Sequence, residues 1–138
     1  MKILVGHDGS EQAEKALKRA LDAALLSKAS IIVVSVVPDL CMMEISDDDC
    51  KKMYEIMTAE ATKRLDALKG ELAAKGITME TEVKFGNAAD TILNIAKERG
   101  ADMIVVGSHG RHGAKKFLLG SVSSKVIEHA ACDVLVVK

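Results

Sequence analysis

The residues that could do chemistry gather between Gly107 and Ser123, where the sequence is GSHGRHGAKKFLLGSVS. Two residues separate Gly107 from Gly110, and nine separate Gly110 from Gly120, which directly precedes a predicted helix. A helix N-terminus presents unpaired backbone N–H groups and a partial positive charge, which together bind phosphate. Gly120 would let a phosphate approach the backbone, and Ser121 and Ser123 would add hydroxyl donors. The pattern indicates an anion site, although glycines that only punctuate a loop, with Ser121 capping the helix, are the alternative.

The same stretch adds positive charge but matches neither of two common phosphate-binding motifs. Arg111, Lys115 and Lys116 lie between the second and third of these spaced glycines. The stretch lacks the G-K-[ST] of a P-loop, and its G-x-x-G differs from the G-x-G-x-x-G of a dinucleotide-binding turn. Any phosphate site here must therefore be of another type.

A second candidate is the acidic residue of GHDGS, Asp8, which follows a short apolar run at the N-terminus. A carboxylate at the end of a buried strand could contact a ribose hydroxyl or a hydrated cation. The same residues could form an Asx turn, in which the Asp8 side chain bonds the backbone near Gly9 and Ser10. The local sequence leaves both interpretations open.

The spacing of histidine, cysteine and acidic residues does not favour a metal site. His7 and His109 follow strands that we expect to be neighbours, and His112 lies close by. No cysteine or second carboxylate stands near them with zinc-ligand spacing. The acidic run SDDDCKK lacks the alternation and the distal glutamate of a calcium loop and is typical of a helix N-terminus. We predict no catalytic residue and no metal held by the protein alone.

Composition limits the class of protein. The 138 residues fit one domain. A net charge of −1 and 2% aromatic residues argue against a nucleic-acid surface or a flavin site. No apolar run reaches the roughly 18 residues of a membrane helix, and the N-terminus lacks a signal-peptide pattern. Three cysteines without C-x-x-C spacing indicate reduced, inert thiols, so we expect a cytoplasmic protein that binds neither nucleic acid nor membrane.

The elements that must position these residues alternate along the chain. Short apolar runs predict strands at residues 2–5, 30–37, 78–85, 103–106 and 133–137. Between them, apolar spacing predicts helices that begin after the candidate N-caps Ser10, Ser46 or Asp47, and Asn87, and at Ser121, with Leu25, Met53 and Ile127 on their inner faces. Strands joined by crossover helices form a parallel sheet, so we predict one Rossmann-like α/β domain over 1–138 with helices on both faces. Ligands of such sheets bind beyond the carboxyl ends of the strands.

The stretch GSHGRHGAKKFLLGS resembles the G-2x-G-9x-G-[S/T] signature of the ATP-binding branch of the universal stress protein family, with the same spacing. The resemblance extends to MKILVGHDGSEQAEKAL, ADMIVVGSHG and SSKVIEHAACDVLVVK, so it covers essentially the whole chain. It implies an open five-stranded parallel sheet of order 3-2-1-4-5, like that of adenine nucleotide alpha hydrolases. It also implies a nucleotide lying across the ends of the first and fourth strands.

The resemblance further implies a set of nucleotide-binding positions. Asp8 would line the nucleoside pocket, and Val36 would lie beside the adenine. Val106 and Gly107 match the approach to ribose and phosphate. The phosphate-holding positions would be Gly110, Gly120, Ser121, Val122 and Ser123. Mg²⁺ would bind through the phosphates of ATP, because it keeps several waters and seldom has an all-protein cage.

Two functions from different classes are consistent with this resemblance. The first is a stress-response protein that binds ATP or another adenine nucleotide and acts as a regulatory homodimer, paired through its last strand, Asp133 to Val137, with slow or no hydrolysis. The alternative is a weak ATPase or autophosphorylating enzyme that uses Ser121 or Ser123. The sequence shows no obvious base, arginine finger or paired carboxylate, so fast hydrolysis is not expected. The segment from Pro38 to Ser46 has no role that the resemblance assigns.

Overall fold

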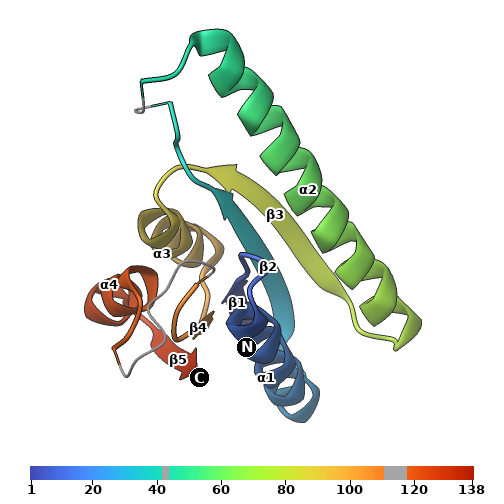
Figure 1. Cartoon of the computed structure of the whole chain (residues 1–138). Coiled ribbons are helices and arrows are strands. Elements are labelled where there is room, and N and C mark those ends of the chain that lie inside the picture. Colours follow the sequence, from blue (N-terminus) through green and yellow to red (C-terminus); the bar gives the residue numbers. More distant parts are fainter. Residues whose placement is uncertain (42–43, 111–117) are drawn as a thin grey trace.

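A computed structural model describes residues 1–41, 44–110 and 118–138, in which strands and helices alternate (Figure 1). The strands are β1 (Lys2–Gly6), β2 (Ser30–Val37), β3 (Met79–Phe85), β4 (Met103–Gly107) and β5 (Asp133–Val137). The helices are α1 (Glu11–Ser27), α2 (Asp47–Ala74), α3 (Ala88–Arg99) and α4 (Ser121–His129). These elements match the predicted ones, with small shifts at their ends. No helix in the described ranges is both long and apolar enough to span a membrane.

The strands form one sheet in the order β3-β2-β1-β4-β5, and all neighbouring pairs are parallel. This confirms the predicted order and the single α/β domain. In the register of the central strands, Val5 of β1 lies between Val33 of β2 and Val105 of β4. The strand order reverses between β1 and β4, so the crevice of the sheet lies beyond the carboxyl ends of these two strands.

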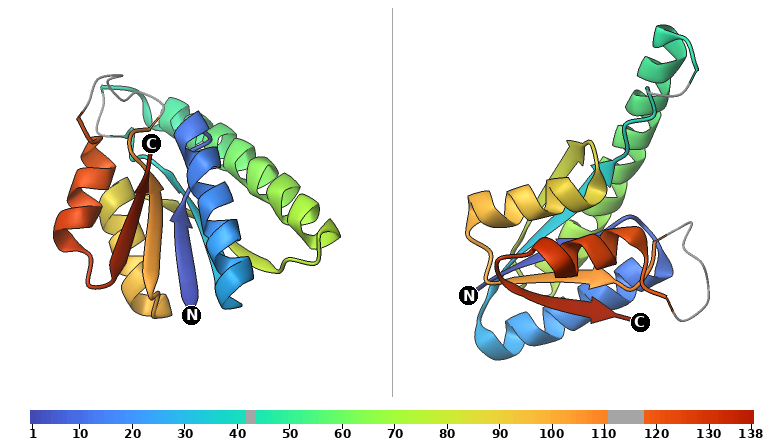
Figure 2. Two further views of the ribbon diagram at one scale, coloured as in Figure 1. Left: turned by 90° about the horizontal axis from the view of Figure 1, so that it is seen from below. Right: turned by 90° about the vertical axis from the view of Figure 1, so that its left-hand side faces the viewer.

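Helices cover both faces of the sheet, with α1 and α2 on one face and α3 and α4 on the other (Figure 2). Successive residues of β1 point to opposite faces, as the strand period of two requires. Ile3 and Val5 pack under α1 and α2, whereas Leu4 packs under α3 and α4. Burial on both faces explains why the central strands read as continuous apolar runs. The two cores fix the ends of β1, β2 and β4 that carry the candidate site.

Side-chain caps begin three of the four helices of the described chain. Ser10, Ser46 and Asn87 each accept a hydrogen bond from the backbone N–H three residues further on, as the sequence predicts. Helix α4 differs because Gly120 occupies its N-cap position and no side-chain cap bond is formed there in the described structure. Ser121 is the first residue of α4 and does not cap it, so the alternative role for Ser121 is wrong.

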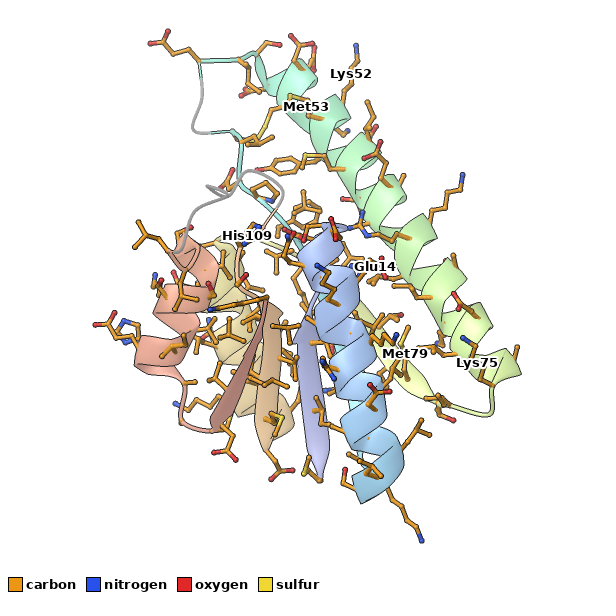
Figure 3. All side chains as sticks on the ribbon, turned by 60° about the horizontal axis from the view of Figure 1, so that its bottom comes forward. Glu14, Lys52, Met53, Lys75, Met79 and His109 are labelled. Atoms are coloured by element: carbon orange, nitrogen blue, oxygen red, sulfur yellow. A yellow bond between two sulfur atoms is a disulfide. The ribbon has the colours of Figure 1, made fainter. Side chains whose placement is uncertain are left out.

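Three apolar residues predicted to face the core are exposed. The exposed fractions are 64% for Leu25, 39% for Met53 and 46% for Ile127. Leu25 and Ile127 each follow a buried residue, Ala24 and Val126, and one step along a helix turns the side chain by about 100°. Met53 lies toward the end of α2 that extends past the sheet (Figure 3).

The prediction of inert thiols is wrong for two of the three cysteines. Cys41 and Cys50 form a disulfide, with their Cα atoms 5.6 Å apart, and Cys132 is free. Residues 39 and 41, which follow β2, contact the first turns of α2, and the two cysteines are within bonding range. The spacing of Cys41 and Cys50 in the sequence carries no recognisable disulfide signal, because their approach depends on the packing of α2.

Candidate functional site

A cavity of about 430 Å³ lies at the carboxyl ends of β1, β2 and β4. Its volume falls in the range of roughly 300–1,000 Å³ that is usual for small-molecule sites. The walls come from the ends of these strands, the start of α1, one face of α2, the start of α3 and the N-terminus of α4. Every nucleotide-binding position implied by the resemblance lines this cavity: Asp8, Val36, Val106, Gly107, Gly110, Gly120, Ser121, Val122 and Ser123.

The N-terminus of α4 forms the anion-favouring side of the cavity. The N–H groups of a first helical turn have no partners within the helix, and α4 provides no side-chain cap for them in the described structure. Ser121 is exposed and lines the cavity. Backbone donors, a helix dipole and one accessible hydroxyl therefore meet at this side.

Ser123 lines the same side, but its hydroxyl is used inside the protein. The side chain is 2% exposed, and its Oγ donates to the carbonyl of Ser108 at 2.9 Å and to the carbonyl of Gly120 at 3.0 Å. Gly120 N–H also donates to the Ser108 carbonyl, at 2.7 Å. Ser123 thus ties α4 to the loop after β4, and a contact from Ser123 to an anion would use its backbone N–H.

Two glycines of the motif allow a close approach of neighbouring groups. A Cβ on Gly107 would lie 2.7 Å from Cβ of Gln12, so the end of β4 can pack against α1 only without a side chain. A Cβ on Gly110 would lie 2.6 Å from Oδ2 of Asp8. Gly107 therefore serves the packing of the fold, whereas Gly110 lets the loop after β4 approach the carboxylate after β1.

Asp8 forms the Asx turn, one of the two interpretations that the sequence left open. Its Oδ1 accepts a hydrogen bond from the Ser10 N–H at 2.9 Å, which closes an Asx turn at the start of α1. The side chain also lines the cavity. The turn fixes the direction of the carboxylate, so a structural role and a ligand-facing position are compatible.

His7, at the end of β1, is a neutral and structural part of the cavity wall. It is 2% exposed, and its Nδ1 accepts a hydrogen bond from the Gly9 N–H at 3.3 Å. The neutral ring therefore carries its proton on Nε2, which lies 3.1 Å from Oε1 of Glu14 without the alignment of a good hydrogen bond. Burial lowers the pKa of His7 below 6.5, and Arg64 acts in the same direction against the opposing charge of Glu14.

The wall contributed by α2 is the part of the cavity that sequence reasoning missed. Arg64 lines the cavity, and its Nη2 donates to Oγ of Ser35 at 3.0 Å. Its guanidinium lies over Gly9, where a Cβ would be 2.9 Å from Nη1. Arg64 follows the buried Ala61 by three positions, so helical spacing could have placed it near the inner face of α2. No sequence signal linked α2 to the glycine-rich stretch.

His109 lies at the cavity end of the molecule, close to the start of α1 that carries Glu14 (Figure 3). Its Nδ1 is 3.0 Å from Oγ of Ser108, and its ring lines the cavity. His7 and His109 follow neighbouring strands, as expected. Among residues 1–41, 44–110 and 118–138, no group of three or more His, Cys, Asp or Glu side chains is placed to hold a metal ion. The predicted cations Arg111, Lys115 and Lys116, with His112, lie outside the described residues.

The fold and the cavity together define an α/β protein with a cavity at the switch point of a 3-2-1-4-5 parallel sheet. The model of the universal stress protein family matches residues 1–138, and the chain belongs to this family.

Individual relatives agree over nearly the full length. The universal stress protein YxiE of Bacillus subtilis is 36% identical over 145 residues, which cover 99% of this chain and 98% of the relative. The solved structure of the universal stress protein UspA from Lactobacillus plantarum has a TM-score of 0.86 at 29% identity, with 100% of this chain and 97% of that chain covered. A universal stress protein solved in complex with cAMP has a TM-score of 0.65 at 29% identity, with the same coverage.

Proposed function

We propose that this chain binds an adenine nucleotide, with ATP as the first candidate, in the cavity at the carboxyl ends of β1, β2 and β4. One observation carries the proposal: the predicted nucleotide-binding residues come from four separate parts of the sequence, one of them the N-terminus of α4, and all of them line this cavity. The family relative that was solved with cAMP supports an adenine nucleotide as the class of ligand.

The proposed orientation follows from the chemistry of the two ends of the cavity. Val36, at the end of β2, offers an apolar wall for the base, and Asp8, beside Val106 and Gly107, would contact the ribose. The phosphates would lie against Gly110, Gly120, Ser121, Val122 and Ser123. Because β1 separates β2 from β4, the two ends are two strand spacings apart, or roughly 10 Å, which suits a ligand with an apolar end and an anionic end.

Mg²⁺ would enter this site with the phosphates. The Asp8 carboxylate lies at the edge of the cavity where a hydrated cation could be contacted through water. The cation would neutralise phosphate charge, while the helix N-terminus and the backbone N–H groups orient the phosphate oxygens.

Slow or absent hydrolysis is part of the proposal. His7 is buried, its pKa is lowered by that burial, and its Nδ1 already accepts a hydrogen bond from Gly9. One oxygen of Asp8 is held in the Asx turn. Neither group is therefore well placed as a general base. Turnover above about 1 s⁻¹ with Mg²⁺ that is lost in Asp8→Ala would favour the ATPase alternative.

We also propose that the protein acts as a homodimer through β5, Asp133–Val137. This strand is an edge of the sheet, and Leu135 on it is 37% exposed. An open edge with an exposed apolar side chain favours pairing with a second chain. Native mass spectrometry should show a dimer that Leu135→Pro disrupts, because proline removes a ladder donor. A wild-type monomer at micromolar concentration would refute this part.

Calorimetric titration of ATP with Mg²⁺ tests the site. Gly120→Val places a side chain where a single Cβ would already be 3.1 Å from Cα of His109, so we expect a large loss of affinity. Ser121→Ala should weaken binding moderately, and Ser124→Ala, an exposed position on the same helix, should leave it unchanged. Circular dichroism would confirm that each variant is folded.

Two results would distinguish a wrong phosphate site from a wrong nucleotide. If wild type and a folded Gly120→Val bind ATP equally, or neither binds below millimolar concentration, the phosphate site is wrong. If the wild type binds AMP or cAMP but not ATP, the site stands and the assigned nucleotide is wrong. Mass spectrometry of freshly purified protein would identify any nucleotide that co-purifies.

A further inference from the structure

One covalent link joins two walls of the cavity. Val36–Pro38 line the cavity at the end of β2, and Cys41 follows three residues after Pro38. Cys41 is bonded to Cys50 in the first turn of α2. Another part of the wall is formed by the same helix, through Met57, Glu60, Ala61 and Arg64. The disulfide therefore fastens the segment after β2 to a helix that also lines the cavity.

The other contacts of this segment are weaker. The Cys41 N–H donates to Oδ1 of Asp39 at 3.1 Å, and the Tyr54 hydroxyl donates to the same carboxylate. Both hydrogen bonds are exposed, and exposed bonds of this kind contribute little net stability. The Tyr54 ring packs edge-on against Phe85 of β3, with 5.1 Å between ring centroids. The disulfide is the one covalent contact among them.

Apart from the contacts of Tyr54, the N-terminal half of α2 is held by few buried residues. Met53 and Lys52 lie at the end of the helix that extends past the sheet (Figure 3). Cys50 and Ala61 are buried, and no residue in the described stretch between them is buried. Cys50 is thus the buried residue of this half of the helix, and its sulfur carries the covalent attachment.

The two sulfurs differ in access. Cys41 is exposed, whereas Cys50 is 5% exposed. Thiol–disulfide exchange requires that a thiolate reach one sulfur of the bond. An incoming thiolate can reach Sγ of Cys41, and Sγ of Cys50 is then the leaving group.

We propose that Cys41–Cys50 is a thiol–disulfide exchange site, with dithiols as its substrate class, and that its redox state controls the attachment of α2 to the end of β2. A thiolate of the dithiol attacks Sγ of Cys41, the Cys41–Cys50 bond breaks, and Cys50 leaves as a thiolate that takes up a proton. The second thiol of the dithiol, as its thiolate, then attacks the mixed disulfide and releases Cys41, which is protonated in turn. The dithiol becomes a cyclic disulfide, and two electrons and two protons pass to the protein.

The exchange site is tested on the full chain with dithiothreitol and glutathione as probes. Under air, iodoacetamide should label only Cys132, and after dithiothreitol it should label all three cysteines. Oxidised glutathione added to the reduced protein should give an adduct on Cys41 before any on Cys50. Three reactive thiols in the air-oxidised protein, or an adduct first on Cys50, would overturn the assignment.

Amide hydrogen exchange tests the attachment of α2. Reduction should speed exchange in residues 36–41 and 50–61 by at least about tenfold, because the ring that restrains them is opened. Exchange in β1 and β4 should not change. Cys41→Ser should behave as the reduced protein with or without dithiothreitol, and Cys132→Ser, the matched control, should respond as wild type does. Equal exchange in the oxidised and reduced wild type would overturn the proposed control of α2.

A last measurement connects this site to the nucleotide and rests on the proposed function. ATP should bind at least about threefold more weakly to the reduced protein, because Met57, Ala61 and Arg64 move with α2. Equal affinity in both redox states would refute the coupling. If neither state binds ATP, the proposed function fails, and labelling and hydrogen exchange alone decide whether the exchange site is correct.

Discussion

Ser123 offers a test that separates packing from ligand binding at the N-terminus of α4. It is 2% exposed, and its hydroxyl donates to the carbonyls of Ser108 and Gly120. Ser123→Ala removes these bonds but keeps the backbone N–H that α4 presents to the cavity. We therefore expect Ser123→Ala to lower the free energy of unfolding, whereas Ser121→Ala, at an exposed position, should leave that free energy nearly unchanged and weaken ATP binding.

The size of the expected loss in unfolding free energy depends on which hydrogen bonds remain in Ser123→Ala. The Ser108 carbonyl still accepts from the Gly120 N–H at 2.7 Å, and the Gly120 carbonyl still accepts from the Ser124 N–H at 3.0 Å. Neither carbonyl is left without a partner, so the loss should be near the net value of one hydrogen bond, about 1 kcal/mol. The higher helix propensity of alanine offsets part of this, by up to about 0.5 kcal/mol.

Urea unfolding followed by circular dichroism measures the effect. A loss of about 1 kcal/mol corresponds to a midpoint shift of roughly 0.5 M urea. Ser124→Ala, an exposed substitution on the same helix, is the matched control and should change stability by less than about 0.5 kcal/mol. ATP affinity of all three serine variants would be measured in parallel.

Two outcomes would contradict this reasoning. An unchanged unfolding midpoint for Ser123→Ala would mean that its hydroxyl bonds do not stabilise the loop after β4. A tenfold loss of ATP affinity at unchanged stability would mean that the Ser123 hydroxyl contacts the nucleotide, which reverses the expected roles of Ser121 and Ser123.

Three further predictions concern other parts of the molecule. Gly70→Ala should raise the unfolding free energy by roughly 0.5–1 kcal/mol in urea, because Gly70 is inside α2 and an added Cβ meets nothing within 4 Å; a loss would contradict this. Because the folded state lowers the pKa of His7 below 6.5, stability should be complete above pH 6.5 and decline below it, by up to about 1.4 kcal/mol per pH unit. In urea unfolding, His7→Gln should not show this loss of stability below pH 6.5. If the stabilities of the wild type and His7→Gln change with pH at the same slope, the prediction is refuted. Dithiothreitol should lower the unfolding free energy of Cys132→Ser by roughly 2–3 kcal/mol, because it breaks the disulfide between two residues that are nine positions apart. It should not change the unfolding free energy of Cys50→Ser.

Local patterns in the sequence were enough to predict the elements and much of the candidate site. The apolar runs of β1, β2 and β4 and the caps Ser10, Ser46 and Asn87 depend on neighbouring residues, so they could be predicted directly. A strand period of two and a helix period of 3.6 act over a few residues. The strand order and the positions Val36, Val106 and Val122 came from a resemblance that spans the chain, and the structure brings all the predicted positions into one cavity.

Several contacts join residues that no local sequence pattern links, so only the tertiary structure decided them. Arg64 reaches Ser35 because α2 packs on β2 and β3, and the exposure of Met53 depends on where the sheet ends beneath that helix. Cys41 and Cys50 meet because the packing of α2 brings its first turn beside Cys41. The Ser123 hydroxyl turns inward because the loop after β4 presents the Ser108 carbonyl to it. Sequence determines periodicity and capping through local sterics and hydrogen bonds, whereas these contacts exist only after the elements have packed together.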